Sequence, residues 1–195
     1  MKNFSKITLG VLFVASATLV SCSNDDDPAP MTKASIYERL GGTKMVADPD
    51  NSGQMIEQGR LSFRKVVNST IGLIVADVQS NAAGNLSAHF APVLAETGST
   101  QSTNIAKLSD NLTDFFSFNT GGTNAVNTYS GLNMVAAHDP ATNPRMGTKS
   151  SNADYTKFVG YVGAAANANG VASNTELYTD VVAVLESLRT PIVQK

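Results

Sequence analysis

The sequence predicts an all-α domain of about six helices packed around one core. The strongest observation is residues 54–79, where apolar side chains recur mainly at spacings of three and four, the repeat of one helical face. Capping boxes precede two of the predicted helices, and helix-stopping residues follow several of them. No convincing strand or hairpin pattern and no internal repeat accompanies these signals, so a bundle of helices is the fold that fits.

The first half of the domain begins with a short helix over residues 35–42, which read SIYERLGG. Ser35 and Glu38 have the spacing of a capping box, and the two glycines at the end are a helix stop. Residues 48–53, DPDNSG, are a loop by composition. The long helix over 54–79 follows, and its wide apolar stripe predicts a central position in the bundle.

Two further amphipathic segments follow the long helix. Residues 86–94 predict a short helix with Asn85 as its cap, in which Pro92 fits only in the first turn or as a kink. Residues 105–116 predict another helix, which the cluster NTGGTN at 119–124 ends.

The C-terminal part of the chain predicts a pair of helices. One restarts near Asn152 and stops at Asn169-Gly170. The last begins at a second capping box, from Ser173 to Glu176, and ends at Pro191.

Residues 128–140, TYSGLNMVAAHDP, carry one of only two histidines in the chain. The pattern predicts a short helix that ends at His138, because Asp139 and Pro140 follow at once. A neutral imidazole is the commonest metal ligand in proteins, and haem iron is often held by a single histidine. A histidine at a helix end is more often a cap or a surface residue. This stretch alone leaves both interpretations open.

The N-terminal residues are predicted to lie outside the helical domain. Residues 1–21 have a lysine-containing start and an apolar run too short to span a bilayer, as in a signal peptide. The residues LVSC that end at Cys22 resemble the lipobox of bacterial lipoproteins, whose cysteine is lipidated, although an ordinary signal peptide with a chance cysteine is the alternative. Residues 22–34 are acidic and contain proline, as in a flexible tether. The folded domain is expected over 35–195.

Export and a lipid anchor on a bacterial membrane, most simply the outer membrane, are therefore expected. The sequence SNDDD after Cys22 also resembles the surface-export signals of Bacteroidetes lipoproteins, which implies display at the cell surface. The lipid would be the only membrane attachment.

Composition excludes several classes of function. Charged residues make up 15% of the chain, the net charge is −2, and no basic patch stands out, so no nucleic-acid partner is expected. A single cysteine permits no disulfide within one chain. No Ser-His-Asp arrangement, carboxylate pair or phosphate-binding loop supports a hydrolytic enzyme.

Several segments resemble group 1 truncated haemoglobins, in the same order along the chain. Residues 35–42 resemble that family's opening, and Phe115-Phe116 before Gly121-Gly122 resembles the end of its distal helix. Tyr129-Ser-Gly and Met134-Val-Ala-Ala-His138 resemble its Tyr-x-Gly and Met-x-x-x-His segment, whose histidine is the proximal haem ligand. Residues 154–171 and 188–192 are similar to the last two helices. The match covers most of 35–192.

The resemblance implies a reduced globin fold with haem (iron protoporphyrin IX) between a distal and a proximal helix. His138 would be the iron ligand. The apolar residues expected to line the haem slot are Phe90, Leu108, Leu112, Phe115 and Phe116, with Met134, Tyr155 and Phe158 on the proximal side. For each of them, packing in the core without a role in haem binding is the alternative. Arg145 would pair with a haem propionate or lie free at the surface.

The chain departs from the family most on the distal side. Thr70 and Ile71 stand where the family commonly has Phe-Tyr, and Leu112 stands near its distal glutamine. A pocket without hydrogen-bond donors would hold dioxygen weakly, because the polar iron–dioxygen unit would lack a stabilising hydrogen bond. Three alternatives stay open for the group that faces the iron on the distal side. The first is the Thr70 hydroxyl, and the second is His89, as a second axial ligand or as a hydrogen-bond donor. The third is that no such group exists, in which case His89 is a loop residue without a role. Insertions are also expected after Gly42, within 79–103 and after His138.

Three functions are consistent with these observations. The first is a lipoprotein that binds haem and, at its iron, dioxygen or another diatomic gas, with nitric-oxide dioxygenation or another haem redox activity within reach. The second is a helical binding or structural lipoprotein that no longer uses haem. The third is capture or carriage of haem at the cell surface. Transfer of haem to a partner would separate the third function from the first.

Overall fold

The computed structural model describes residues 32–96 and 105–195. The predicted signal peptide, Cys22 and most of the predicted tether lie outside the described residues. Residues 34–195 form one compact unit. Among the described residues, no helix is both long and apolar enough to cross a membrane.

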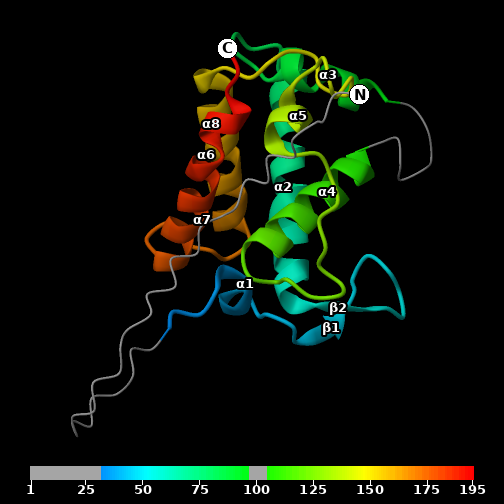
Figure 1. Cartoon of the computed structure of the whole chain (residues 1–195), viewed down its shortest axis with the longest axis vertical. Helices are drawn as coiled ribbons and strands as arrows, with labels where there is room; N and C mark the ends of the chain where they lie inside the picture. The colour runs from blue at the N-terminus through cyan, green and yellow to red at the C-terminus, as the bar shows by residue number, and fades with distance from the viewer. Residues whose placement is uncertain (1–31, 97–104) are drawn as a thin grey trace, which may run out of the picture. The chain divides into compact units, whose positions relative to one another are not determined.

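The long helix α2 (Gln58–Gln79) is the centre of the fold, as its apolar stripe predicts. It packs most extensively against α4 (Ile105–Asn119) and α6 (Asn152–Ala168), which lie along it on either side (Figure 1). The remaining helices are α1 (Ile36–Arg39), α3 (Ser87–Ala95), α5 (Met134–His138), α7 (Glu176–Ser187) and α8 (Arg189–Ile192). Figure 1 shows α3 and α5 near one end of α2 and α1 near the other. The prediction of an all-α fold is confirmed.

The core lies between α1, α2, α4, α6 and α7. Its buried residues are Tyr37, Phe63, Val67, Ile71, Phe116, Val162 and Leu185. The ring of Phe63 stacks between those of Tyr37 and Phe116, at centroid distances of 6.3 and 6.0 Å. Such aromatic pairs add about 0.5–1.5 kcal/mol each beyond the area they bury. This stack fixes the end of α4 against the start of α2.

The short helix α1 begins and ends as its sequence predicts. The Ser35 hydroxyl accepts from the Glu38 amide (3.1 Å), and the Glu38 carboxylate accepts from the Ser35 amide (2.8 Å), which completes the capping box. Gly41 and Gly42 follow with φ of +111° and +55°, a backbone that side chains rarely adopt. A side chain at Gly41 would also collide with Gln58.

A two-stranded antiparallel hairpin precedes α2, and the expectation of no strands is wrong here. Strand β1 (Met45–Ala47) pairs with β2 (Met55–Glu57), with Val46 opposite Ile56. Each strand has three residues, which is too short to show an alternating pattern. The first residues assigned to the long helix from sequence therefore belong to β2, and α2 begins at Gln58.

Three predicted helix ends are also wrong. Thr175, not Ser173, caps α7, because its hydroxyl accepts from the Tyr178 amide at 3.2 Å. Pro191 lies within the short helix α8 rather than after the last helix. Leu86, not the predicted Asn85, is the N-cap residue of α3, whose sixth residue is Pro92. In each of these the local pattern allowed a neighbouring boundary, and tertiary packing selected it.

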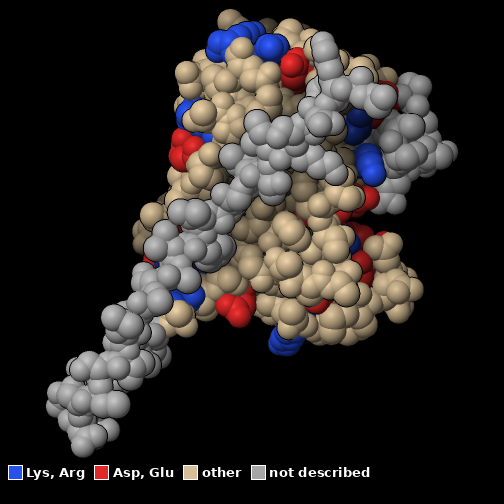
Figure 2. All heavy atoms as spheres, viewed as in Figure 1, with Lys and Arg blue, Asp and Glu red and all other residues tan. Residues whose placement is uncertain are grey.

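Charged side chains are sparse on the face seen in Figure 2, most of which belongs to other residue types. This agrees with the low charged fraction of the sequence, 15%.

Candidate functional site

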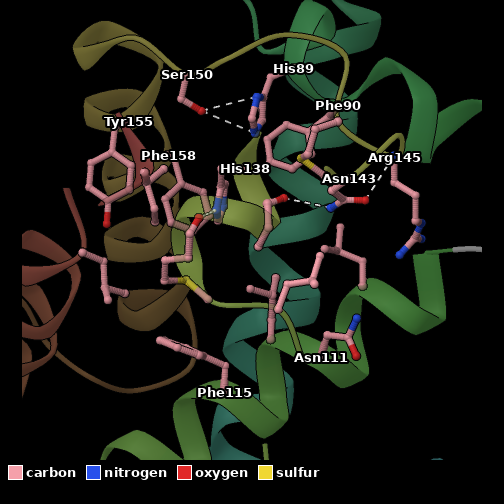
Figure 3. A pocket seen from close by; sticks show the side chains of 18 of the residues that line it. His89, Phe90, Asn111, Phe115, His138, Asn143, Arg145, Ser150, Tyr155 and Phe158 are labelled. Atoms are coloured by element: carbon pink, nitrogen blue, oxygen red, sulfur yellow. Dashed lines mark hydrogen bonds between the residues drawn. The ribbon is translucent and has the colours of Figure 1, made fainter. Parts of the chain in front are cut away.

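A largely apolar cavity of about 170 Å³, measured as the space open to the centre of a water molecule, lies among α3, α4, α5, α6 and the C-terminal helices. One water needs only about 10–15 Å³ by this measure, so the cavity could hold a ligand far larger than a solvent molecule. Figure 3 shows its lining side chains.

All nine residues predicted from sequence to line a cofactor slot border this one cavity. They are Phe90, Leu108, Leu112, Phe115, Phe116, Met134, His138, Tyr155 and Phe158. They come from α3, α4, α5 and α6, so only the tertiary fold brings them together.

His138 is the last residue of α5, a one-turn helix held at both ends. At its start, the Asn133 side chain accepts from the Ala136 amide at 3.0 Å. At its end, the Asn143 side-chain amide donates to the Ala137 carbonyl at 2.8 Å, which satisfies a carbonyl that the helix leaves unpaired. The helix therefore presents His138 to the cavity from a fixed position.

The hydrogen bonding of the His138 ring leaves its Nε2 atom available to coordinate a metal ion. Nδ1 donates to the Met134 carbonyl, 2.9 Å away, within the same helical turn. Nδ1 therefore carries the proton, and Nε2 keeps its lone pair. Within the part of the chain that the structure describes, Nε2 has no hydrogen-bond partner. A backbone carbonyl on the far nitrogen is the usual support of a metal-binding histidine.

Burial lowers the pKa of His138, and the nearby His89 lowers it further, although the hydrogen bond to Met134 opposes both effects. The imidazole is therefore neutral at pH 7, which is the form that binds a metal ion.

His89 lies in α3 with only 4% of its surface exposed, so the alternative that places it in a loop is wrong. Its Nδ1 donates to the Thr148 carbonyl at 2.6 Å. The Ser150 hydroxyl lies 3.3 and 3.4 Å from the two ring nitrogens, as Figure 3 shows. Burial lowers the pKa of this histidine as well, against the effect of the Thr148 hydrogen bond.

Thr70 does not border this cavity. Its hydroxyl donates to the Val66 carbonyl at 2.9 Å, a common bond for a threonine inside a helix. Thr70 instead lines a neighbouring apolar cavity of about 40 Å³, which shares Leu112, Phe116 and Phe158 with the first. Ile71 is buried in the core.

Polar side chains border the cavity at a few points. Arg145 binds Glu96 through two hydrogen bonds of 2.5 and 2.8 Å, so it is paired within the protein rather than lying free at the surface. The Asn111 amide also lines the cavity. Tyr129 lines it too, but its hydroxyl donates to the Leu132 carbonyl at 2.6 Å.

Several lining residues were missed from sequence. Asn111 lies one turn before the predicted Phe115, so helical spacing pointed to it. Met146 and Ser150 come from an irregular loop, where no periodic signal exists. Leu185, Leu188 and Ile192 were assigned only to the last helix and to core packing.

No group of three or more histidine, cysteine, aspartate or glutamate side chains able to hold a metal ion occurs in residues 32–96 or 105–195.

No family model matches the sequence, and no curated protein matches it significantly. Among solved structures, the chain is similar to the truncated haemoglobin of Tetrahymena pyriformis in its Fe(III) form. The TM-score is 0.53 and the sequence identity is 19%, over 83% of this chain and 100% of that chain. The predicted globin-like reduced helical fold is therefore confirmed.

Proposed function

We propose that this protein binds haem in the cavity described above, with His138 as an iron ligand. The observation that carries the proposal is the state of that imidazole. It lines an apolar cavity, its Nδ1 is tied to the Met134 carbonyl, and its Nε2 retains a lone pair. A neutral imidazole in an apolar, water-excluding slot is a common axial ligand arrangement for haem iron.

The residues present suit a flat apolar macrocycle. Leu108, Leu112 and Phe115 on α4 and Phe158 on α6 would contact its faces. Asn111 and Arg145 border the same cavity and could meet the carboxylates of the ring. Arg145 would then be shared with Glu96, which now holds it. Bound haem would supply an iron that binds a diatomic gas or exchanges an electron.

We infer further that the ligand at the iron is dioxygen or another diatomic gas, and that the protein is an exported lipoprotein anchored through Cys22. Support for the gas ligand is the likeness of the fold to a truncated haemoglobin. Support for the anchor is the sequence around Cys22.

Haem capture and carriage is the second candidate, and one observation favours it. The hydroxyls of Thr70 and Tyr129 both donate to backbone carbonyls, so neither is left to stabilise bound dioxygen. Transfer of haem from the loaded protein to a purified receptor, with weak dioxygen binding, would select carriage over gas binding.

Thermal unfolding with and without haemin tests haem binding against a purely structural role. A ligand that binds only the native state adds about 2.7 kcal/mol of stability at a hundred times its dissociation constant. We expect haemin to raise the Tm of the wild type by several degrees, and the Tm of His138→Ala far less. An identical Tm for the wild type with and without haemin would contradict the proposal.

A further inference from the structure

We propose that His89 is the second axial ligand of the bound haem iron, opposite His138. The inference rests on the haem binding proposed above and assigns the sixth coordination position of the same iron. Of the distal alternatives left open by the sequence, Thr70 is directed at Val66 and borders a different cavity.

The two imidazoles lie at a separation that suits one metal ion between them. Their ring centroids are 5.9 Å apart, and their planes are within 7° of parallel. An imidazole nitrogen binds a metal ion at about 2 Å, so two rings on opposite sides of one ion have centroids roughly 6 Å apart. Both rings line the same cavity (Figure 3), and they are the only histidines in the chain.

The two rings also present the same nitrogen for coordination. His89 Nδ1 is held by the Thr148 carbonyl at 2.6 Å, and His138 Nδ1 is held by the Met134 carbonyl at 2.9 Å. Each carbonyl fixes the proton on Nδ1. The Nε2 lone pair of His138 is then open to a metal ion, and Nε2 of His89 lies 3.4 Å from the Ser150 hydroxyl, a long hydrogen bond that a metal ion would replace.

A single frame at the C-terminus holds both histidines in place. The Ser150 carbonyl accepts from the Gln194 amide at 3.0 Å, so the chain end fixes the loop that carries Thr148 and borders His89. The Gln194 side chain donates at 2.8 Å to the carbonyl of Val135, the second residue of α5, the helix whose last residue is His138. Because one segment bonds to both supports, the spacing between the rings is set before any ligand enters.

Ligation by both histidines would leave no open position on the iron. An external gas would bind only after His89 dissociates, so the observed rate would scale with the fraction of open molecules. Such a site suits electron transfer or haem carriage better than rapid storage of dioxygen.

The test uses the haemin-loaded full-length protein, with optical and electron paramagnetic resonance spectra of wild type, His89→Ala and a control. The expected wild type is low-spin, with two imidazole ligands. His89→Ala is expected to keep its haem, become high-spin, and return to low-spin when imidazole is added. Ser87→Ala, on the same helix but not lining the cavity, should match the wild type. Carbon monoxide should bind ferrous His89→Ala at least ~tenfold faster, as expected if fewer than ~10% of wild-type molecules are open.

The outcomes separate this inference from haem binding itself. A wild type that binds haem but is high-spin, with a spectrum unchanged in His89→Ala, overturns the assignment of His89 and leaves haem binding intact. A low-spin His89→Ala without added imidazole identifies another ligand and overturns the assignment too. A folded wild type that takes up no haem overturns the proposed function, and with it this inference.

Discussion

The side-chain amide of Asn127 donates to the carboxylate of Glu57 over 2.7 Å, in the protein interior. The Tyr37 hydroxyl donates to the same carboxylate at 2.5 Å. The Asn124 side-chain amide lies 3.0 and 3.2 Å from its two oxygens. Glu57 immediately precedes α2, and the two asparagines belong to the segment that leads from α4 to α5. This network therefore anchors the chain that runs to the His138 helix.

Loss of Asn127 should destabilise the whole domain. Asn127→Ala removes donors from a buried carboxylate and from Tyr37, and we expect a loss of about 2–3 kcal/mol in the free energy of unfolding. Urea denaturation of the haem-free protein measures it. Asn119→Ala, at an exposed position at the end of α4, is the matched control and should change stability by less than about 0.5 kcal/mol. Equal stabilities for the two variants would show that the network is not structural.

The same carboxylate predicts a pH dependence of stability. Burial raises the pKa of Glu57, but the hydrogen bonds from Tyr37, Asn124 and Asn127 outweigh it and hold the pKa below its usual value. The folded state therefore binds this proton at a lower pH than the unfolded chain, whose glutamates titrate near about 4.3. The stabilisation is present above that pH and is lost as pH falls through the lowered pKa.

Glu57→Gln should isolate this contribution. The variant should be less stable than the wild type at pH 7, and the difference should shrink as the pH falls below about 4.3, because Glu57 of the unfolded wild type then binds a proton that the folded state binds only at lower pH. Urea unfolding at a series of pH values measures the difference. A gap that stays constant down to pH 3 would mean that the Glu57 pKa is not depressed in the folded state.

The hydrogen bonds of Gln194 to Ser150 and Val135 should control how firmly haem is held. Gln194→Ala removes the bond to the Val135 carbonyl, and we expect haem to leave several-fold faster because α5 loses a support. Transfer of haem to an excess of a haem-accepting protein gives this rate. Thr190→Ala, at an exposed position in α8, is the control and should leave the rate unchanged. If haem dissociates from Gln194→Ala at the same rate as from the control, the Gln194 hydrogen bond does not help to hold haem.

Thr70 should have no part in gas binding. Its hydroxyl is bonded to Val66, so Thr70→Val should leave the dissociation rate of dioxygen or carbon monoxide unchanged. Flash photolysis of the ferrous haem protein provides the comparison, with Asn111→Leu as a substitution inside the cavity. A dissociation rate that rises in Thr70→Val would show that the hydroxyl reaches the iron-bound gas.

Local sequence signals predicted the parts of the fold that depend on neighbouring residues. The capping box of Ser35 and Glu38 formed as predicted, α6 restarted at Asn152, and His138 ended its short helix before Pro140. The nine residues that the family resemblance implied for one slot border one cavity. Helical spacing had already placed four of them, Leu108, Leu112, Phe115 and Phe116, on one face of a helix.

The remainder depends on contacts between distant residues. His89 is held by Thr148 from a loop 59 positions away, and no local pattern marks that pairing. Glu57 meets Asn127 across 70 positions, and neither residue stands out in the sequence. The three-residue strands of the hairpin are too short for any periodic signal. These features arise from tertiary packing, which overrides local preference.

Titration of the haem-free protein with haemin, followed at the Soret band in wild type and His138→Ala, tests the central claim most directly. We predict a saturating Soret shift in the wild type and an affinity at least ~tenfold lower in His138→Ala, since loss of an axial ligand costs more than about 1.4 kcal/mol. Identical titration curves for the two proteins, or no Soret shift in a folded wild type, would contradict the assignment of His138 as a haem ligand.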